Sequence, residues 1–233
     1  MGLPILQHPT FELEIPSTKQ LVRYRPFLVK EEKILLLAQQ AGEPNDFIRA
    51  INQIIEACVD GVDINRLTNF DTEYIFLQLR ANSVSELAKI NIQDEETEEW
   101  VEVQIDLHEV EVPKLEEIDN RIVLNNDVFL ELRYPRYVDL LKIASDEALD
   151  TSLELISMCI DKVYNGVEVL EMKDFSAQEQ DDFVNSFSAD AFTKIQQYFT
   201  SMPKVTMEIK YKVKVDGKTK TKKRILEGIN DFF

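Results

Sequence analysis

The chain has 233 residues, of which 44% are hydrophobic and 9% aromatic, enough to bury an ordinary core and too apolar for wholesale disorder. Its formal net charge is −17, and no apolar run approaches the ~20 residues that a membrane-spanning helix needs. Only 6 glycines are present, and no phosphate-loop, dinucleotide or nucleophile-elbow motif occurs, so the common nucleotide-binding and hydrolase signatures are absent.

The charge is distributed unevenly along the chain. Residues 204–224 contain nine Lys or Arg against two acidic residues, a local balance of +7, so the remainder carries −24. Residues 94–119 contain twelve Asp or Glu against a single lysine. An acidic body repels phosphate except at its basic segment, which disfavours general nucleic-acid binding. The same asymmetry suits head-to-tail docking with other proteins.

The first part of the chain alternates strand and helix patterns. The residues predict a hairpin over 10–25, followed by helices over 29–40, from Asn45 or Asp46 to about Gly61, and over 71–88 with Asp71 as its cap.

Between the hairpin and the first helix lies a corner. Pro26 cannot donate to a sheet ladder and biases the preceding residue away from helix, so the strand hands over to the helix at this point. We therefore predict that Tyr24, Arg25 and Pro26 form a structural corner, with Glu31 or Glu73 as the charge partner of Arg25.

The middle of the chain has a strand-rich pattern followed by helices. Alternation predicts a strand over 100–113, and strands over 122–124 and 128–132 joined by an Asn-Asn-Asp turn. Further expected elements are helices over 137–144 and 149–164, a strand over 167–172, and two helices capped by Ser176, with Glu179 in a capping box, and by Ser188.

The last element is a basic hairpin. Apolar residues alternate from Val205 to Val215, Asp216-Gly217 is a strong turn signal, and residues 218–226 return. The lysines are compatible with a solvated strand face, a docking arm for an acidic protein, or a nucleic-acid contact. Our hypothesis for partner binding names Lys210, Lys212, Lys214, Lys220, Lys222, Phe232 and Phe233.

The two terminal phenylalanines have two interpretations. Either they fold back into the core, or they form an exposed plug for a groove on a partner. Two Phe at a mobile terminus need a socket, within this chain or on another.

Two features suggest a loose internal duplication. Tyr24-Arg25-Pro26 resembles Tyr134-Pro135-Arg136, and residues 54–61 resemble 155–161, although the two offsets differ and helix composition alone could produce the similarity. The predicted fold class is α+β, with antiparallel strands and hairpins, two helical segments and a C-terminal β-hairpin. Its parts are 1–92, 93–203 and 204–233, which also fit one compact unit.

No catalytic, cofactor or metal site is predicted. Cys58 and Cys159 lie within apolar helical patterns, as buried thiols of a reducing compartment do. His8 and His108 are far apart, without a cysteine at ligand spacing. Acidic residues are too abundant for any carboxylate pair to stand out.

Several stretches resemble baseplate proteins of T-even-type bacteriophages. They are Leu3-Pro4, Pro16-Ser17-Thr18, and the segments 24–33, 69–81 and 226–233. The resemblance implies a non-enzymatic structural or assembly component of the baseplate hub, or central spike complex, at the tip of a contractile tail.

The resemblance also sets expectations for partners. They are other baseplate hub or tail proteins, with the tape measure as a further candidate, and neither a membrane nor nucleic acid. The protein is expected in the host cytoplasm during assembly and, if retained, in the virion tail baseplate. The alternative is a transient tail-assembly chaperone for a hub or tape-measure protein, absent from the mature virion. Some relatives carry cysteine pairs in the last hairpin, like a zinc ribbon; this chain has no cysteine after Lys204, so no metal is expected there.

Overall fold

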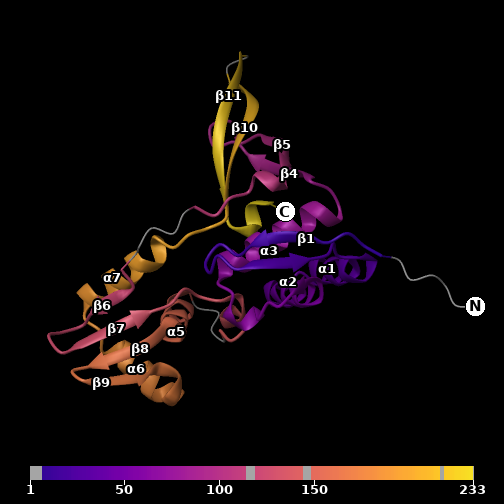
Figure 1. Cartoon of the computed structure of the whole chain (residues 1–233). Helices are drawn as coiled ribbons and strands as arrows, with labels where there is room; N and C mark the ends of the chain where they lie inside the picture. The colour runs from indigo at the N-terminus through magenta and orange to yellow at the C-terminus, as the bar shows by residue number, and fades with distance from the viewer. Residues whose placement is uncertain (1–6, 114–118, 144–147, 216–217, 233) are drawn as a thin grey trace, which may run out of the picture. The chain divides into compact units, whose positions relative to one another are not determined.

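The computed structural model describes residues 7–113, 119–143, 148–215 and 218–232. The chain is α+β, as predicted, with antiparallel strands in several small sheets (Figure 1). It divides into two compact units. Unit 1 contains Met1–Ile64, Phe70–Lys114 and Pro203–Phe233, and unit 2 contains Asn65–Asn69 and Leu115–Met202. The predicted parts 1–92, 93–203 and 204–233 follow chain order, whereas unit 1 joins stretches that are distant in sequence.

Unit 1 begins with a ββααβ motif whose three strands form an antiparallel sheet in the order β1-β2-β3. Its elements are β1 (Phe11–Glu14), β2 (Leu21–Tyr24), α1 (Val29–Ala41), α2 (Pro44–Cys58) and β3 (Val59–Asp60). Helix α1 ends at Gly42, whose φ of 74° is the left-handed conformation that glycine adopts without strain. Pro44 then occupies the first turn of α2, where its missing N–H costs nothing.

Unit 2 repeats this element order. Its motif consists of β6 (Arg121–Val123), β7 (Val128–Leu132), α4 (Tyr137–Leu140), α5 (Ala148–Cys159) and β8 (Ile160–Asn165). A further strand, β9 (Glu168–Glu171), extends the sheet to the order β6-β7-β8-β9. The unit continues with the 3₁₀ turn η3 (Met172–Asp174) and the helices α6 (Ala177–Asn185) and α7 (Ala189–Thr200). The motif of unit 1 therefore has a second copy, as the sequence suggested.

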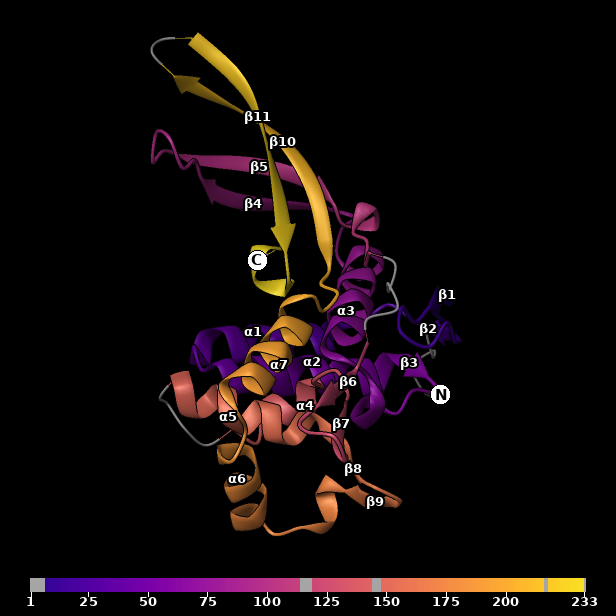
Figure 2. The ribbon, with the colours of Figure 1, turned by 90° about the vertical axis from the view of Figure 1, so that its left-hand side faces the viewer.

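The rest of unit 1 is a helix and two hairpins. After the 3₁₀ turn η1 (Ile64–Arg66), most of which belongs to unit 2, come α3 (Asn69–Ser83), β4 (Leu87–Gln93), β5 (Trp100–Asp106) and η2 (Leu107–Glu109). The C-terminal elements are β10 (Thr206–Val215), β11 (Lys218–Glu227) and η4 (Ile229–Phe232). The hairpins β4-β5 and β10-β11 lie next to each other and share one apolar core with α3 (Figure 2). The Asp216-Gly217 turn lies outside the described residues.

Two predicted helices are shorter than expected and give way to strands. The helix predicted to 88 ends at Ser83, and β4 follows, with its alternating residues Ala88, Ile90 and Ile92 buried against the core. The helix predicted over 149–164 ends at Cys159, because β8 pairs with β7 from Ile160 onward. Both apolar runs fit helical spacing locally, and pairing with a distant strand decides the outcome.

Smaller differences concern the ends of elements. The strand predicted over 100–113 ends at Asp106, and the helix predicted over 137–144 ends at Leu140. Helix α3 begins at Asn69, before the predicted cap Asp71. The Asp71 carboxylate instead accepts hydrogen bonds from the N–H (2.9 Å) and hydroxyl (2.5 Å) of Ser17, which ties α3 to the β1-β2 turn. The capping box of Ser176 and Glu179 is confirmed.

Candidate functional site

The basic hairpin β10-β11 has two different faces, because residues directly opposite each other in a ladder point to the same side. Tyr211 is opposite Lys222 and Val213 is opposite Lys220, so these two lysines share the face on which β10 buries its apolar side chains. Lys210, Lys212 and Lys214 lie on the other face and are exposed. The register therefore divides the five lysines of the predicted site into two sets.

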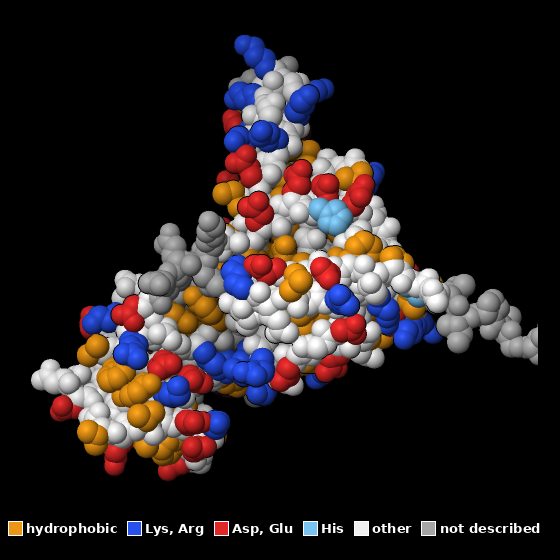
Figure 3. Space-filling view, in the orientation of Figure 1, with side chains coloured by type: hydrophobic (Ala, Val, Ile, Leu, Met, Phe, Trp, Pro, Cys, Tyr) orange, Lys and Arg blue, Asp and Glu red, His pale blue; other side chains and the backbone are white. Residues whose placement is uncertain are grey.

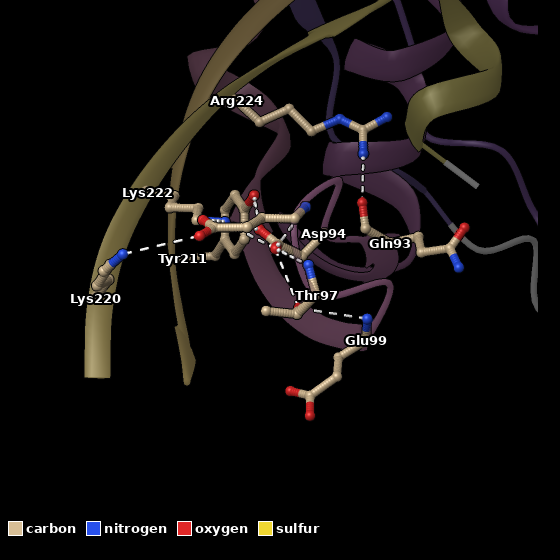
Figure 4. Close-up of polar contacts among 9 residues, drawn as sticks. Gln93, Asp94, Thr97, Glu99, Tyr211, Lys220, Lys222 and Arg224 are labelled. Atoms are coloured by element: carbon tan, nitrogen blue, oxygen red, sulfur yellow. Dashed lines mark hydrogen bonds and ion pairs between the residues drawn. The ribbon is translucent and has the colours of Figure 1, made fainter. Parts of the chain in front are cut away.

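The inner set binds an acidic turn of the same chain. Lys222 Nζ donates to both carboxylate oxygens of Asp94, at 2.8 and 2.9 Å, and lies 2.9 Å from Glu96 (Figure 4). The hydroxyl of Tyr211 donates to Asp94 at 2.7 Å. Lys220 Nζ lies 3.9 Å from Glu96. These contacts hold the tip of the β4-β5 hairpin against β10-β11.

Asp94 is the centre of this cluster, with a side chain that is 0% exposed. Thr97 donates to Oδ1 from both its N–H and its hydroxyl, and the Glu96 N–H adds another bond to the same oxygen. The hydrogen bonds from Lys222 and Tyr211 hold the pKa of Asp94 well below its ordinary value, and the same contacts raise the pKa values of Lys222 and Tyr211. All three groups therefore keep their protonation states at neutral pH and act as a structural clamp.

The outer face presents lysines to solvent. No ion pair to Lys210, Lys212 or Lys214 occurs within the described ranges, whereas Lys223 on the same face pairs with Glu208 at 2.8 Å. Space-filling shows blue side chains gathered along this hairpin (Figure 3). Of the lysines named from the sequence, these three are exposed to solvent, whereas the ammonium of Lys222, which was also named as a partner contact, is bound within the chain.

The corner residues close the junction between β2 and α1. Arg25 donates to Glu31 at 2.9 Å, to the Ala57 carbonyl at 2.9 Å and to the Pro26 carbonyl at 2.9 Å. Burial alone would raise the pKa of Glu31, which is 1% exposed, but the bonds from Arg25 and from the Leu28 N–H hold it below its ordinary value. Of the two predicted partners, Glu31 is the one that Arg25 contacts.

Tyr24 anchors the same corner from the strand side. Its ring is 4% exposed and stacks on Phe11 at 5.5 Å, and its hydroxyl accepts a hydrogen bond from the Asn82 amide at 2.8 Å. Burial raises the pKa of the Tyr24 hydroxyl. Pro26 supplies the carbonyl that Arg25 binds.

The second copy contains the same corner around Arg133. This guanidinium donates to Asp139 at 2.7 Å, to the Met158 carbonyl at 2.5 Å and to the Tyr134 carbonyl at 3.0 Å. In both copies the backbone N–H of the arginine donates a hydrogen bond to the carbonyl of the cysteine that ends the second helix, Cys58 or Cys159. Arg25 thus corresponds to Arg133, which corrects the sequence alignment that set Tyr24-Arg25-Pro26 against Tyr134-Pro135-Arg136.

The C-terminal segment is held by α3. Phe232 is 0% exposed in the core of unit 1, and its carbonyl accepts a hydrogen bond from Arg80 at 3.0 Å. Glu73 accepts a bond from the Ile229 N–H. Phe232, predicted as a partner contact, is therefore corrected to a core residue whose socket lies in its own chain. Phe233 lies outside the described residues.

Features that would support catalysis or metal binding are sparse in the described part of the chain. Cys58 and Cys159 are buried free thiols, and burial raises their pKa values to about 11 and about 12, which suppresses the reactive thiolate. The described residues contain no group of three or more His, Cys, Asp or Glu placed to hold a metal ion. A cavity of about 540 Å³ in unit 2 is lined in part by Arg133 and Asp139, whose charges already pair with each other.

None of the described helices combines the length and apolarity that crossing a bilayer requires. The site described above is a row of exposed lysines on a hairpin that internal ion pairs fix to β4-β5. A family model described as T4 bacteriophage base plate protein matches residues 8–233. The chain belongs to this family. No curated protein and no solved structure gives a significant match.

Membership gives this baseplate protein a structural role in the phage baseplate, a place in the virion tail and contacts with other baseplate proteins. The sequence showed that residues 94–119 are strongly acidic, but it did not identify Asp94 as the internal partner of Lys222. The alternation of side chains along β10 and β11 was the signal that could have found it. Tyr211 and Lys222 share the buried face of the hairpin, and polar groups on a buried face need hydrogen-bond partners.

We predict that Arg25→Ala lowers the free energy of unfolding by about 3–5 kcal/mol, because it leaves the buried Glu31 carboxylate without its counter-charge. Arg25→Lys recovers little, since one ammonium cannot reach three acceptors. The matched control is Arg23→Ala, two residues away in an exposed pair with Glu12, which should cost below about 1 kcal/mol. Urea denaturation measures all three, and equal effects of the Arg23 and Arg25 variants would contradict the role of the corner.

A second prediction concerns pH. Burial raises the pKa of Glu73 from its ordinary value of 4.5 to about 7. The hydrogen bond from the Ile229 N–H and the charge of Lys204 lower this pKa, but burial has the larger effect. Between these values the folded protein holds a proton that the unfolded chain has lost, so stability falls as pH rises. Glu73→Gln should therefore exceed the wild type in stability at pH 8, by up to roughly 3 kcal/mol, and lose this advantage at pH 4.5.

Urea denaturation at both pH values measures this difference. Glu32→Gln, at an exposed position of α1, serves as the control and should shift stability equally at the two pH values. A Glu73→Gln effect that is independent of pH would contradict the buried carboxyl.

Proposed function

We propose that this protein is a non-enzymatic structural or assembly component of the baseplate hub that acts through protein–protein contacts. The observation that carries the proposal is the outer face of the β10-β11 hairpin, where Lys210, Lys212 and Lys214 project in a row without an ion pair in the described residues. The remainder of the chain is strongly acidic and repels other acidic surfaces, whereas the lysine row attracts them. The row therefore sets the orientation in which an acidic partner docks.

The internal contacts of the hairpin support this role. Lys222 and Tyr211 hold Asp94, and thereby fix the hairpin on β4-β5. A rigid support means that little order is lost when the outer face binds, which favours a lasting contact. An arm that is fixed at its inner face and basic at its outer face suits a hub subunit that meets acidic tail proteins, among which the tape measure is a further candidate partner.

The proposal extends to where and when the protein acts. Assembly takes place in the host cytoplasm, and the protein is retained in the tail baseplate of the finished particle. For a phage that encodes it, quantitative mass spectrometry of purified particles should find stoichiometric copies. Absence from mature particles, together with binding to hub or tape-measure proteins in infected cells, would replace this proposal with the transient chaperone.

Charge reversal on the outer face provides a direct test. We expect Lys210→Glu, Lys212→Glu and Lys214→Glu, combined in one variant, to lower incorporation into tails at least about tenfold, because like charges would then face each other at the contact. The melting temperature should change little, since all three side chains are exposed.

The matched control reverses Lys19, Lys33 and Lys89, which are exposed lysines of unit 1 outside the hairpin, and changes the net charge equally. Equal incorporation of the two triple variants would contradict the proposal. Binding of duplex or single-stranded DNA by the wild type at low salt, lost in the hairpin variant, would instead point to nucleic acid.

A further inference from the structure

The four-stranded sheet of unit 2 has an outward face with an unusual row of side chains. Because alternate residues of a strand point to opposite sides, one row across the sheet enters the core and the next faces outward. The inner row consists of Ile122, Leu130, Val163 and Leu170. The outward row consists of Val123, Phe129, Tyr164 and Val169. Val123 is 59% exposed and Val169 is 55% exposed.

The aromatic centre of this outward row is ordered. The rings of Phe129 and Tyr164 stack with centroids 4.3 Å apart and planes at 7°. The Arg121 guanidinium lies 5.6 Å from the centre of the Phe129 ring. Orange side chains gather over this sheet among red and blue ones in the space-filling view (Figure 3). A flat apolar strip with preset rings is suited to docking, since little side-chain freedom is lost on contact.

A charged row runs beside the apolar one on the same face. In the strand order β6-β7-β8-β9 it consists of Arg121, Glu131, Lys162 and Glu171, so the signs alternate. Lys162 lies 3.8 Å from Glu131, and the Tyr164 hydroxyl donates to Glu131 at 2.6 Å. From β6 to β9 the charges are positive, negative, positive and negative, and from β9 to β6 each position carries the opposite sign.

The first copy of the motif serves as an internal comparison. On the corresponding face of its sheet, Leu21 takes the place of Phe129, and its ladder partner there is Glu14. The neighbouring row is Glu12, Arg23 and Asp60. The same ββααβ motif thus forms with a polar outward face, so its folding does not require the aromatic strip of the second copy.

We propose that this face of unit 2 docks against the same face of a second copy of the chain, about a two-fold axis parallel to the strands and between β7 and β8. Such an axis reverses the strand order, so Arg121 meets Glu171 of the second copy, and Glu131 meets Lys162. In the apolar row Phe129 meets Tyr164 and Val123 meets Val169. Every position in both rows then faces a complementary one.

The pattern favours a second copy over an unrelated partner. An isologous interface requires a surface that complements itself after rotation, which an alternating charge row of even length does. A partner of one sign would be repelled by half of the row. Four short strands cover less than the ~800 Å² per partner of a standard interface, so the expected dimer is weak, with a dissociation constant on the order of tens of micromolar.

Sedimentation velocity of the full chain between about 1 and about 500 µM tests the proposal in that range. The wild type should form dimers as its concentration rises. Arg121→Glu should weaken the dimer at least about tenfold, because residue 121 would then face Glu171 of the second copy. Adding Glu171→Arg should restore it, since the swapped row is still complementary to its own reverse.

A second pair of variants tests the apolar row with a matched control. Val169→Asp should weaken the dimer, whereas Leu21→Asp, at a 62% exposed position on the corresponding sheet of the first copy, should not. Circular dichroism confirms that each variant is folded. A wild type that stays monomeric throughout, a charge swap that does not restore dimers, or equal effects of the two Asp variants would overturn the inference. The proposed hub function does not depend on the outcome.

Discussion

A buried carboxylate paired with an arginine sets the geometry of both halves of this protein. Glu31 and Asp139 are almost fully buried, and a buried charge is tolerated only when it is paired and hydrogen-bonded. Arg25 and Arg133 provide this pairing. Each guanidinium also donates to the backbone carbonyl of the residue that precedes the final cysteine of the second helix, Ala57 or Met158. One side chain therefore joins the end of a strand, the start of one helix and the end of another, and this explains why the ββααβ motif has the same connections twice.

The two copies then differ in what is added to them. In the first, α3 and two hairpins build a shared core that includes the C-terminal Phe232. In the second, β9 extends the sheet by one strand, and its outward face exchanges the polar residues of the first copy for an aromatic strip. The common motif supplies the frame of both units. The exposed lysine row lies on the added β10-β11 hairpin, whereas the aromatic strip runs across the motif strands β6, β7 and β8 and the added β9. This arrangement agrees with a structural role in the baseplate.

Charge in this protein is used in two ways that the net value of −17 conceals. Part of the basic segment is neutralised internally, because Lys222 binds Asp94 and Glu96 and so fixes one hairpin on another. The other part, on the opposite side of β10, stays exposed to solvent. A shift of one residue in the pairing of β11 with β10 would turn Lys220 and Lys222 to the outer face, since successive side chains of a strand point to opposite faces. The register of β10-β11 therefore decides which lysines stabilise the fold and which face outward.

The amino-acid sequence by itself determined the α+β class, the hairpin at the C-terminal end and the bounds of α1, because strand alternation, a Gly stop and local apolar spacing act over a few residues. It also suggested the duplication, although with the wrong arginine aligned. Only the tertiary structure decided that residues 87–93 and 160–165 are strands, that Phe232 is a core residue, and that Asp94 is the partner of Lys222. These outcomes depend on contacts between residues up to 152 positions apart, and such long-range contacts override the local preference from which a sequence pattern is read.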